Sequence, residues 1–264
     1  MNIRASVNYH IHSDTAQAFR FDVDGIVGNL ISPELSTDEV KVQDVRSQDY
    51  ALNFGNDGIL FADSHSVITD FDKCSDWQTQ YNQEIVDLLA QQIDAHEVIV
   101  FDHTLRIDTV DAVRKPARNV HNDYSTQGAN QRLIDLIGSE RATEFQKGRF
   151  GFVNVWRPIE RAITSSPLGF IHPRSIEPKD WMTIELIYPD RKGQILGVGA
   201  NPKHEWFYQS NMTPNEVVIF NIYDNRGQPH LAHSALDIAN QPDNSPPRKS
   251  IETRTLVRYN YVNR

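Results

Sequence analysis

Cysteine is almost absent from this sequence, because Cys74 is the only one among 264 residues. A lone thiol cannot build an intrachain disulfide framework or a cysteine-based zinc site. Such scarcity is typical of proteins kept in a reducing compartment, so we expect a cytoplasmic location. Histidine, in contrast, occurs 10 times, which directs attention to metal ligation by imidazole.

Basic residues are also in short supply, with 26 Lys and Arg against 35 Asp and Glu and a formal charge of −9. No basic stripe offsets this balance, so we expect no nucleic-acid partner. No apolar run approaches the ~18 residues of a membrane span, and the first residues contain no apolar segment of a secretory signal. We therefore expect a small-molecule substrate and no membrane partner, and the sequence leaves the oligomeric state open.

The hydrophobic pattern changes along the chain from mixed to strand-rich. Apolar residues at helical spacing predict helices over 77–96 and near 127–145, and a β-branched run predicts a strand over 97–107. Short strand-like runs separated by Pro, Gly, Asn and Asp follow at 149–159, 181–189, 193–200, 205–210, 216–224, 230–236 and 250–262. This order predicts one mainly β domain over 1–264, a jelly roll braced by helices, with a mixed α/β part over about 1–115.

The segment "NVHNDYSTQG" (119–128) contains His121 and Asp123 near a predicted strand end. Side chains two apart on a strand point to the same face, about 6–7 Å apart at their Cα atoms, so both can reach one metal ion. Asn122 would point away. With a second, distant histidine, such a pair forms the facial triad of non-haem iron oxygenases. On its own the pair also fits a surface histidine beside a capping aspartate.

The second histidine should lie on a late strand, and "PHLAHSAL" (229–236) offers His230 and His233. Pro229 places His230 at a strand start, whereas His233 lies inside the apolar run, so we favour His233 as the ligand. A buried structural histidine at position 233 is the alternative.

The next segment, "PPRKSIETRTLV" (246–257), places Arg248, Ser250 and Arg254 on one face of a strand. An oxygenase that uses 2-oxoglutarate must hold a distal carboxylate, and the planar guanidinium fork of arginine does this well. A solvated edge strand, with Glu252 paired to an arginine, is the competing interpretation.

Taken together, these segments resemble a family of natural-product tailoring enzymes that includes gibberellin-desaturase-like and cephamycin 7α-methoxylation-related proteins. The resemblance covers about residues 45 to 258 and is carried by "FDHTLR" (101–106), "VHNDYS" (120–125), "NVWRPI" (154–159), "PLGF" (167–170), "HEWFYQSNMTPNEVVIFNIYD" (204–224), "HSAL" (233–236) and "RKSIETR" (248–254). It implies a double-stranded β-helix (the cupin-like jelly roll) and an Fe(II)/2-oxoglutarate-dependent dioxygenase that consumes O2.

By position, the resemblance implies His121, Asp123 and His233 as the catalytic iron ligands. It implies that Arg248 or Arg254, with Ser250, binds 2-oxoglutarate, without deciding between the two arginines. Asn154 or Arg157, on a strand expected to line the site, could bind the other carboxylate of 2-oxoglutarate. Residues expected to contact substrate are Arg106, Trp156, His204, Trp206 and Tyr208; a salt bridge at Arg106 and core packing of the aromatic residues are the alternatives.

The resulting hypothesis is an oxygenase of secondary metabolism that oxidises an unactivated C–H bond of a small, carboxylate-bearing, amino-acid-like substrate. The outcome would be hydroxylation, desaturation or oxidative cyclisation, between which the sequence does not choose. Two other functional classes stay open at this point: a cupin-like metal-dependent isomerase or hydrolase, and a non-catalytic jelly-roll domain that binds a small ligand.

Overall fold

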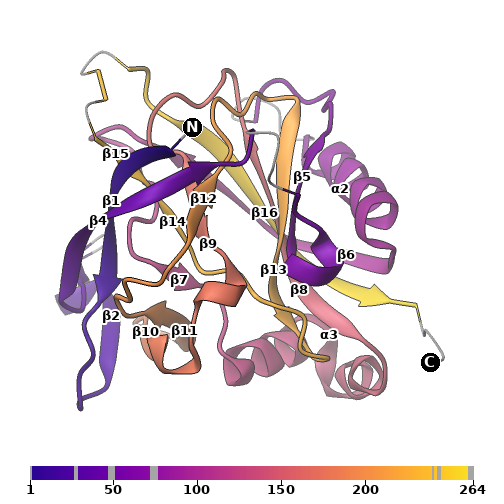
Figure 1. Ribbon diagram of the computed structural model, residues 1–264. Coiled ribbons are helices and arrows are strands. Elements are labelled where there is room, and N and C mark those ends of the chain that lie inside the picture. Colours follow the sequence, from indigo (N-terminus) through magenta and orange to yellow (C-terminus); the bar gives the residue numbers. More distant parts are fainter. Residues whose placement is uncertain are drawn as a thin grey trace.

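Two facing β-sheets make up the core of the protein in a computed structural model, which describes residues 2–26, 29–46, 51–71, 77–239, 241–242 and 245–260 (Figure 1). Cys74 lies outside the described residues. The smaller sheet has the order β5 (Ile59–Asp63), β13 (Glu216–Asp224), β8 (Phe150–Pro158), β16 (Lys249–Tyr259) and β6 (Ala95–Ile107). All of its strand pairs are antiparallel.

The larger sheet contains the short strands that carry the metal-ligating motif. Its order is β15 (Asp237–Ile238), β1 (Asn2–His10), β4 (Leu35–Asp44), β12 (Trp206–Tyr208), β9 (Leu168–Ile171), β14 (His233–Ala235), β7 (His121–Asn122), β11 (Lys192–Val198), β10 (Trp181–Ile187), β2 (Gln17–Phe21) and β3 (Leu30–Ile31). In its centre, β7 pairs with β14 on one side and with β11 on the other.

Helices cover the smaller sheet and one end of the sandwich (Figure 1). The amphipathic helix α2 (Trp77–Ile93) packs Tyr81, Ile85 and Leu89 against the outer face of the smaller sheet. Helix α3 (Thr126–Lys147) is capped at its N-terminus by Ser125, whose hydroxyl accepts a hydrogen bond from the Gly128 amide. The short elements are α1 (Phe54–Asp57) and the 3₁₀ turns Val23–Gly25, Pro173–Ser175 and Pro178–Asp180.

Aromatic side chains from both sheets fill the space between them, among them Phe170 and Phe207 from the larger sheet and Phe152 and Phe220 from the smaller one. This packing of two inner faces is the arrangement expected for a jelly roll, and the prediction of a mainly β fold with flanking helices is confirmed. The expected strand 230–236 is shorter than predicted, because His230 lies in the preceding loop and β14 begins at His233.

On the inner face of the smaller sheet, side chains that are register partners on neighbouring strands form rows across the sheet, and four such rows follow one another along the strands. The rows are Tyr223–Phe152–Leu256, then Phe220–Asn154–Arg254–Asp102, then Val218–Trp156–Glu252–Thr104, and finally Pro158–Ser250–Arg106. Polar side chains thus begin at the second row, and the first row is apolar apart from the Tyr223 hydroxyl.

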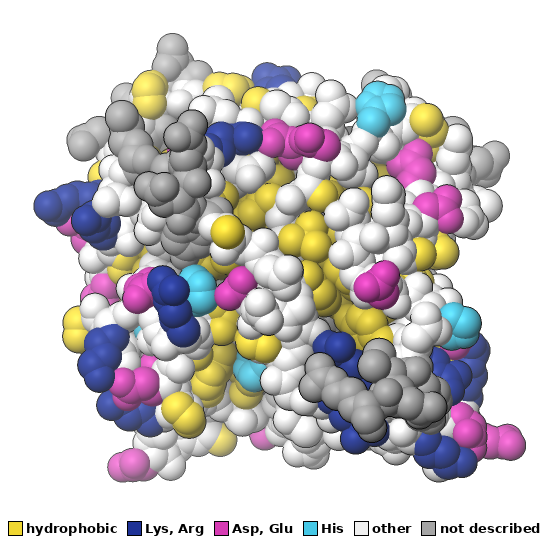
Figure 2. Space-filling model, turned by 45° about the vertical axis from the view of Figure 1, so that its right-hand side comes forward, with side chains coloured by type: hydrophobic (Ala, Val, Ile, Leu, Met, Phe, Trp, Pro, Cys, Tyr) yellow, Lys and Arg dark blue, Asp and Glu magenta, His cyan; other side chains and the backbone are white. Residues whose placement is uncertain are grey.

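The surface carries charges of both signs. On the face drawn in Figure 2, acidic and basic side chains are interspersed around patches of apolar surface. Among the described residues, no helix is long and apolar enough to span a membrane.

Two glycines with positive φ allow a matched test of the loop before β14. Gly58 (φ 72°) and Gly227 (φ 86°) both occupy the left-handed region, but a Cβ at Gly58 would overlap the Pro229 carbonyl oxygen, whereas Gly227 has open space around it. Gly227→Ala should therefore cost only the ~1–2 kcal/mol of left-handed strain, and Gly58→Ala should cost at least about 3 kcal/mol. Urea unfolding of both variants measures the difference, and equal losses would contradict the close approach of these two loops.

Candidate metal centre

Three side chains converge at the centre of the larger sheet. His121 and His233 are register partners on β7 and β14, and Asp123 follows β7 directly. One potential ligand atom from each lies within 4.8 Å of the other two. The Asp123 Oδ1 atom is 3.4 Å from His121 Nε2 and 3.9 Å from His233 Nε2. The structure therefore brings together the three residues that the sequence singled out as metal ligands.

Backbone carbonyls orient both imidazoles. His121 Nδ1 lies 2.8 Å from the Asn119 carbonyl oxygen, and His233 Nδ1 lies 3.0 Å from that of Leu231. If each Nδ1 carries the proton and donates it to the carbonyl, each Nε2 presents a lone pair toward Asp123 and the partner imidazole. This second-sphere hydrogen bond is the usual companion of a metal-ligating histidine. Burial also lowers the pKa of His233 to about 4, which keeps its imidazole neutral at ordinary pH.

The two oxygens of Asp123 face different partners. Oδ2 accepts hydrogen bonds from Asn154 Nδ2 at 2.9 Å and from Arg254 Nε at 3.2 Å, which leaves Oδ1 directed at the imidazoles. Burial alone would raise the pKa of the Asp123 carboxyl, but the Arg254 guanidinium and the two imidazoles hold it well below its usual range. The carboxylate is therefore ionised and presents one oxygen.

Two imidazole nitrogens and one carboxylate oxygen are the donor set of the facial triad that holds non-haem Fe(II) and leaves other coordination positions open. The pre-set Nε2 lone pairs and the ionised carboxylate fit that ion. A structural histidine would instead be expected to satisfy both ring nitrogens within the protein.

Arg254 is engaged by acidic partners on every side. Besides Asp123, its guanidinium donates to Asp102 Oδ2 at 2.7 Å and to Thr104 Oγ1 at 2.8 Å, and it forms an ion pair with Glu252. Burial alone would lower the pKa of Arg254, but these carboxylates raise it above its usual value. Asp102 and Thr104 were not anticipated as part of the site, although the period-2 pattern of "FDHTLR" places them on one face.

Arg248 has a different environment. Only 3% of its surface is exposed, its Nε donates to Ser250 Oγ at 3.1 Å, and its Nη1 donates to the Ser166 carbonyl at 2.8 Å. Its guanidinium also lies 5.0 Å from the centre of the Trp156 ring. Among the described residues no carboxylate forms an ion pair with it, and burial, helped by nearby Arg106, lowers its pKa to about 9. A buried guanidinium of this kind lacks an anion.

Asn154, Trp156 and Arg106 all lie on the inner face near these groups. Asn154 binds the Asp123 carboxylate, and Trp156 packs beside Arg248. Arg106 is the register partner of Ser250, and its Nη1 donates to the Lys115 carbonyl at 2.9 Å. Burial lowers the pKa of Arg106.

Arg157 lies on the opposite face of β8, as expected for a residue one position from Trp156. Its guanidinium donates to the backbone carbonyls of Ser64 and Pro214, near the ring of Tyr81 on α2. The structure therefore separates Arg157 from the triad, and its expected contact with 2-oxoglutarate has no geometric support.

His204, Trp206 and Tyr208, which were expected to contact substrate, are also directed away from the triad. Trp206 and Tyr208 belong to the cluster between β1 and β12, where Trp206 Nε1 donates to the Tyr9 hydroxyl at 2.8 Å. His204 Nδ1 lies 2.9 Å from the same hydroxyl. The inward position on β12 is Phe207, so strand alternation and core packing account for Trp206 and Tyr208. His204 precedes the strand and is held between the Tyr9 hydroxyl and Asp180.

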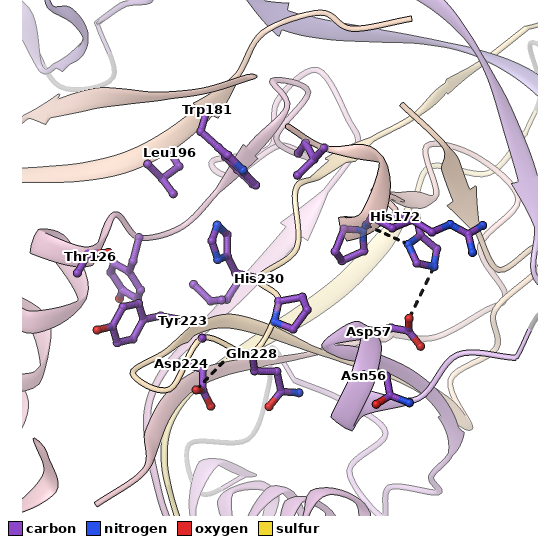
Figure 3. Close-up of a pocket in the computed structure, with 17 residues that line it drawn as sticks. Asn56, Asp57, Thr126, His172, Trp181, Leu196, Tyr223, Asp224, Gln228 and His230 are labelled. Atoms are coloured by element: carbon purple, nitrogen blue, oxygen red, sulfur yellow. Dashed lines mark hydrogen bonds and ion pairs between the residues drawn. The ribbon is translucent and has the colours of Figure 1, made fainter. Parts of the chain in front are cut away.

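A pocket with a volume of about 560 Å³ is lined by residues from several elements, and apart from His230 the sequence analysis anticipated none of them (Figure 3). Tyr124, which directly follows Asp123, is part of its wall together with Leu196, the register partner of Asn122. The position of Tyr124 directly after Asp123 is the sequence feature that could have singled it out. The other contributions come from segments far apart in the chain.

Known proteins resemble this chain over nearly its whole length. The family model described as "Oxidoreductase/YMDC permease-like domain" matches residues 8–258. Hydroxylase/desaturase efuI of Hormonema carpetanum is 31% identical over 88% of this chain and 87% of its own, and alpha-ketoglutarate-dependent dioxygenase phiK of a fungal species is 30% identical over 84% of each. The solved structure of the iron and alpha-ketoglutarate-dependent endoperoxidase NvfI matches with a TM-score of 0.87 at 22% identity, over 98% of this chain and 99% of the other.

Asn122 provides a test that separates the metal ligands from their support. It is fully buried, and its amide donates to the carbonyls of Tyr124 at 2.9 Å and Ile222 at 3.0 Å, away from the triad. Asn122→Ala should lower the free energy of unfolding by about 2–3 kcal/mol, because two buried acceptors lose their donor. It should change the Kd for Fe(II) by less than about threefold, whereas His121→Ala should raise that Kd at least about 100-fold.

Anaerobic Fe(II) titration and urea unfolding of both variants measure these quantities. A loss of iron affinity in Asn122→Ala as large as that in His121→Ala would contradict the side-chain directions described above.

Proposed function

Because this chain belongs to the Oxidoreductase/YMDC permease-like family and is a non-haem Fe(II)/2-oxoglutarate-dependent dioxygenase, we propose that His121, Asp123 and His233 hold its iron. The observation that carries the proposal is the convergence of the three ligand atoms within 4.8 Å, with both Nδ1 atoms already engaged by carbonyls. The cofactors are Fe(II), 2-oxoglutarate and O2.

We further propose that the oxidation occurs at an unactivated C–H bond of a small molecule. Bound Fe(II), with 2-oxoglutarate and O2, supplies the oxidising chemistry, and the protein supplies orientation and exclusion of water. Asn154 and Arg254 fix the Asp123 carboxylate, so the ligand set is pre-organised before the metal binds. Hydroxylation, desaturation and oxidative cyclisation are all consistent with this arrangement.

Arg248, with Ser250, is the proposed binding site for the distal carboxylate of 2-oxoglutarate. Its support is the contrast between the two arginines of β16: Arg254 is engaged by Asp123, Asp102 and Glu252, whereas Arg248 is buried without a described acidic partner. A dicarboxylate would supply the anion that Arg248 lacks. Asn154 is proposed to position Asp123 rather than to contact 2-oxoglutarate, because its amide is already bound to Oδ2.

The expectation of a carboxylate on the substrate does not carry over into this proposal. It was based on Arg106, Arg157 and whichever of Arg248 and Arg254 did not bind 2-oxoglutarate. Arg157 faces α2, Arg254 is paired, and Arg106 lies in the row of Ser250, beside the proposed 2-oxoglutarate site.

Substitution of the two late histidines tests the ligand assignment. Under anaerobic conditions, wild-type protein loaded with Fe(II) and 2-oxoglutarate should give the visible metal-to-ligand charge-transfer band of a chelated 2-oxo acid. His233→Ala should abolish the band because one ligand is missing, and His230→Ala should retain it. Absence of the band in wild-type protein with full iron occupancy would exclude the proposed function, and the reverse behaviour of the two variants would reassign the ligand.

The two arginines of β16 form a second matched pair. Arg248→Met should raise the Kd for 2-oxoglutarate about 30-fold or more, because charge-assisted hydrogen bonds are lost, and should leave Fe(II) affinity unchanged. Arg254→Met should instead weaken Fe(II) binding about 10- to 100-fold, as expected for a residue that supports a metal ligand. Titration of the charge-transfer band with 2-oxoglutarate at saturating iron, and with iron at saturating 2-oxoglutarate, separates the two effects.

A further inference from the structure

The side chains of the smaller sheet become more exposed along the row that touches Asp123. Asn154 on β8 is 2% exposed, whereas the side chain of Arg254 on β16 is 16% exposed and that of Asp102 on the edge strand β6 is 42% exposed. In the next row, Thr104 on the same edge strand is buried. The interior is therefore open to solvent at β6, at the level of Asp123.

The larger sheet shows the same gradient. Phe170 on β9 is fully buried, and the exposed fraction of the ligand side chains rises from 3% for His233 on β14 to 10% for His121 on β7. Further along the sheet, Met182 on β10 and Phe19 on β2 share the face of His121 and are half-buried. The metal ligands are thus accessible from the direction of β10 and β2.

The two gradients lead to the same side of the molecule. Phe220 of β13 packs against Phe170 of β9, with ring centroids 5.1 Å apart, and Arg254 of β16 donates to Asp123, which follows β7. The order β13, β8, β16 and β6 therefore runs in the same direction as the order β9, β14, β7 and β11. The open side of the metal ligands has β6 as its border in the smaller sheet and β10 and β2 in the larger one.

Arg132 lies between the two sheets at this open side. It belongs to α3, which covers one end of the sandwich (Figure 1). The first turn of α3 packs on β11, where a Cβ at Gly128 would overlap the Gln194 carbonyl oxygen. One turn further on, the guanidinium carbon of Arg132 lies 4.9 Å from the centre of the Phe101 ring on β6. The helix thus carries Arg132 from the larger sheet toward the edge strand of the smaller one.

Phe101 fixes the level of Arg132 along the sheet. It directly precedes Asp102, and its ring packs edge-to-face against Phe152 of the first row, with ring centroids 5.9 Å apart. Ser250, beside Arg248, belongs to the fourth row, about 20 Å away along the strands. One molecule of 2-oxoglutarate is too short to contact both arginines, so Arg132 is left for another ligand.

Arg132 has no acidic partner among the described residues, and its Nε is buried without a hydrogen-bond partner. The carboxylates of Asp102 and Asp123 are both engaged by Arg254. A guanidinium over an aromatic ring keeps its N–H donors available in its own plane, where they match the two oxygens of a carboxylate. Arg132 therefore offers donors on the open side for which the described chain supplies no carboxylate.

Arg141, on the same helix, provides the contrast. Its guanidinium carbon lies 5.6 Å from the centre of the Phe145 ring, and it forms an ion pair with Glu97. The two arginines of α3 share the contact with an aromatic ring and differ in the presence of a carboxylate.

Tyr124 connects Arg132 to the metal ligands. It directly follows Asp123, and its ring packs against Phe152 with the centroids 5.0 Å apart. Burial raises the pKa of its hydroxyl to about 12, the Asp123 carboxylate adds to this shift, and the Arg132 guanidinium opposes it. The neutral hydroxyl thus lies within the electrostatic reach of both groups and is available as a second donor to an anion at Arg132.

We propose that Arg132 binds an acidic group of the substrate, and that the substrate is a carboxylic acid whose apolar body lies on the open side of the metal ligands. The half-buried Met182 and Phe19 provide apolar surface for that body. The inference rests on the proposed function for its link to the metal, and it adds the substrate class and the residue that selects it. An arginine that the sequence analysis did not consider thus gives the expected carboxylate a new basis.

Two naphthalene probes of nearly equal size, 2-naphthylacetate and the neutral 2-naphthylacetamide, test the substrate class. Binding to the full chain, loaded anaerobically with Fe(II) and saturating 2-oxoglutarate so that Arg248 is occupied, is measured by equilibrium dialysis. The acid should bind at least about tenfold more tightly than the amide, because charge-assisted hydrogen bonds are stronger than neutral ones. Equal or tighter binding of the amide would overturn the acidic class.

Arg132→Met and Arg141→Met form a matched pair on α3. Arg132→Met keeps a long apolar side chain over Phe101 and should raise the Kd for the acid about tenfold, while changing that for the amide less than about twofold. Arg132→Lys should restore part of the loss because it retains the charge. Arg141→Met removes the same charge from the same helix and should change neither Kd.

Three results would overturn the role of Arg132. They are unchanged binding of the acid in Arg132→Met, equal losses for the acid and the amide in that variant, and a loss for the acid in Arg141→Met as large as that in Arg132→Met.

The charge-transfer band distinguishes failure of this inference from failure of the proposed function. Absence of the band from fully loaded wild-type protein would refute the proposed function, whatever the probes do. A normal band that saturating 2-naphthylacetate does not perturb would refute the inference alone, because the acid would then not lie near the metal. The expected result is a perturbation whose midpoint moves to about tenfold higher acid concentration in Arg132→Met, with the affinities for Fe(II) and 2-oxoglutarate unchanged.

Discussion

The Asp123 carboxylate is the contact on which the arrangement of the site depends, because it connects the two sheets at their centre. One oxygen faces the imidazoles of the larger sheet, and the other is bound by Asn154 and Arg254 of the smaller sheet. The negative charge is favourable at this buried position only because Arg254 and the hydrogen bonds compensate for desolvation. Asp123 is thereby held in one rotamer, ready to present a single oxygen beside two pre-oriented nitrogens.

Buried arginines take different roles in this fold according to the partners they find. Arg254 is surrounded by carboxylates, so its charge is satisfied within the protein and serves to fix Asp123. Arg157 is bound by backbone carbonyls on the outer face, where it ties β8 to neighbouring loops. Arg248 has a hydroxyl, a carbonyl and an aromatic ring around it but no described carboxylate, which suits it to an anionic ligand.

Along the inner face of the smaller sheet, the side chains change from apolar at one end to charged and polar at the other. Apolar and aromatic residues dominate the end that adjoins the pocket, and arginines with Ser250 occupy the other end.

Local pattern in the sequence determined the mainly β class and the two long helices, because period-2 and helical spacing are short-range signals. The set of His121, Asp123 and His233 was implied by the order of the motifs and by the family resemblance. Local pattern also placed Arg248 and Arg254 on one face, but it could not separate their roles, since Asp102 and Glu252 reach Arg254 only through strand register. The sequence analysis misplaced Trp206 and Tyr208 for the same reason: only the neighbours of β12 decide that Phe207 points inward and Trp206 outward. The pocket was decided by tertiary structure alone, because folding brings together segments as far apart in the chain as Asn56 and His230.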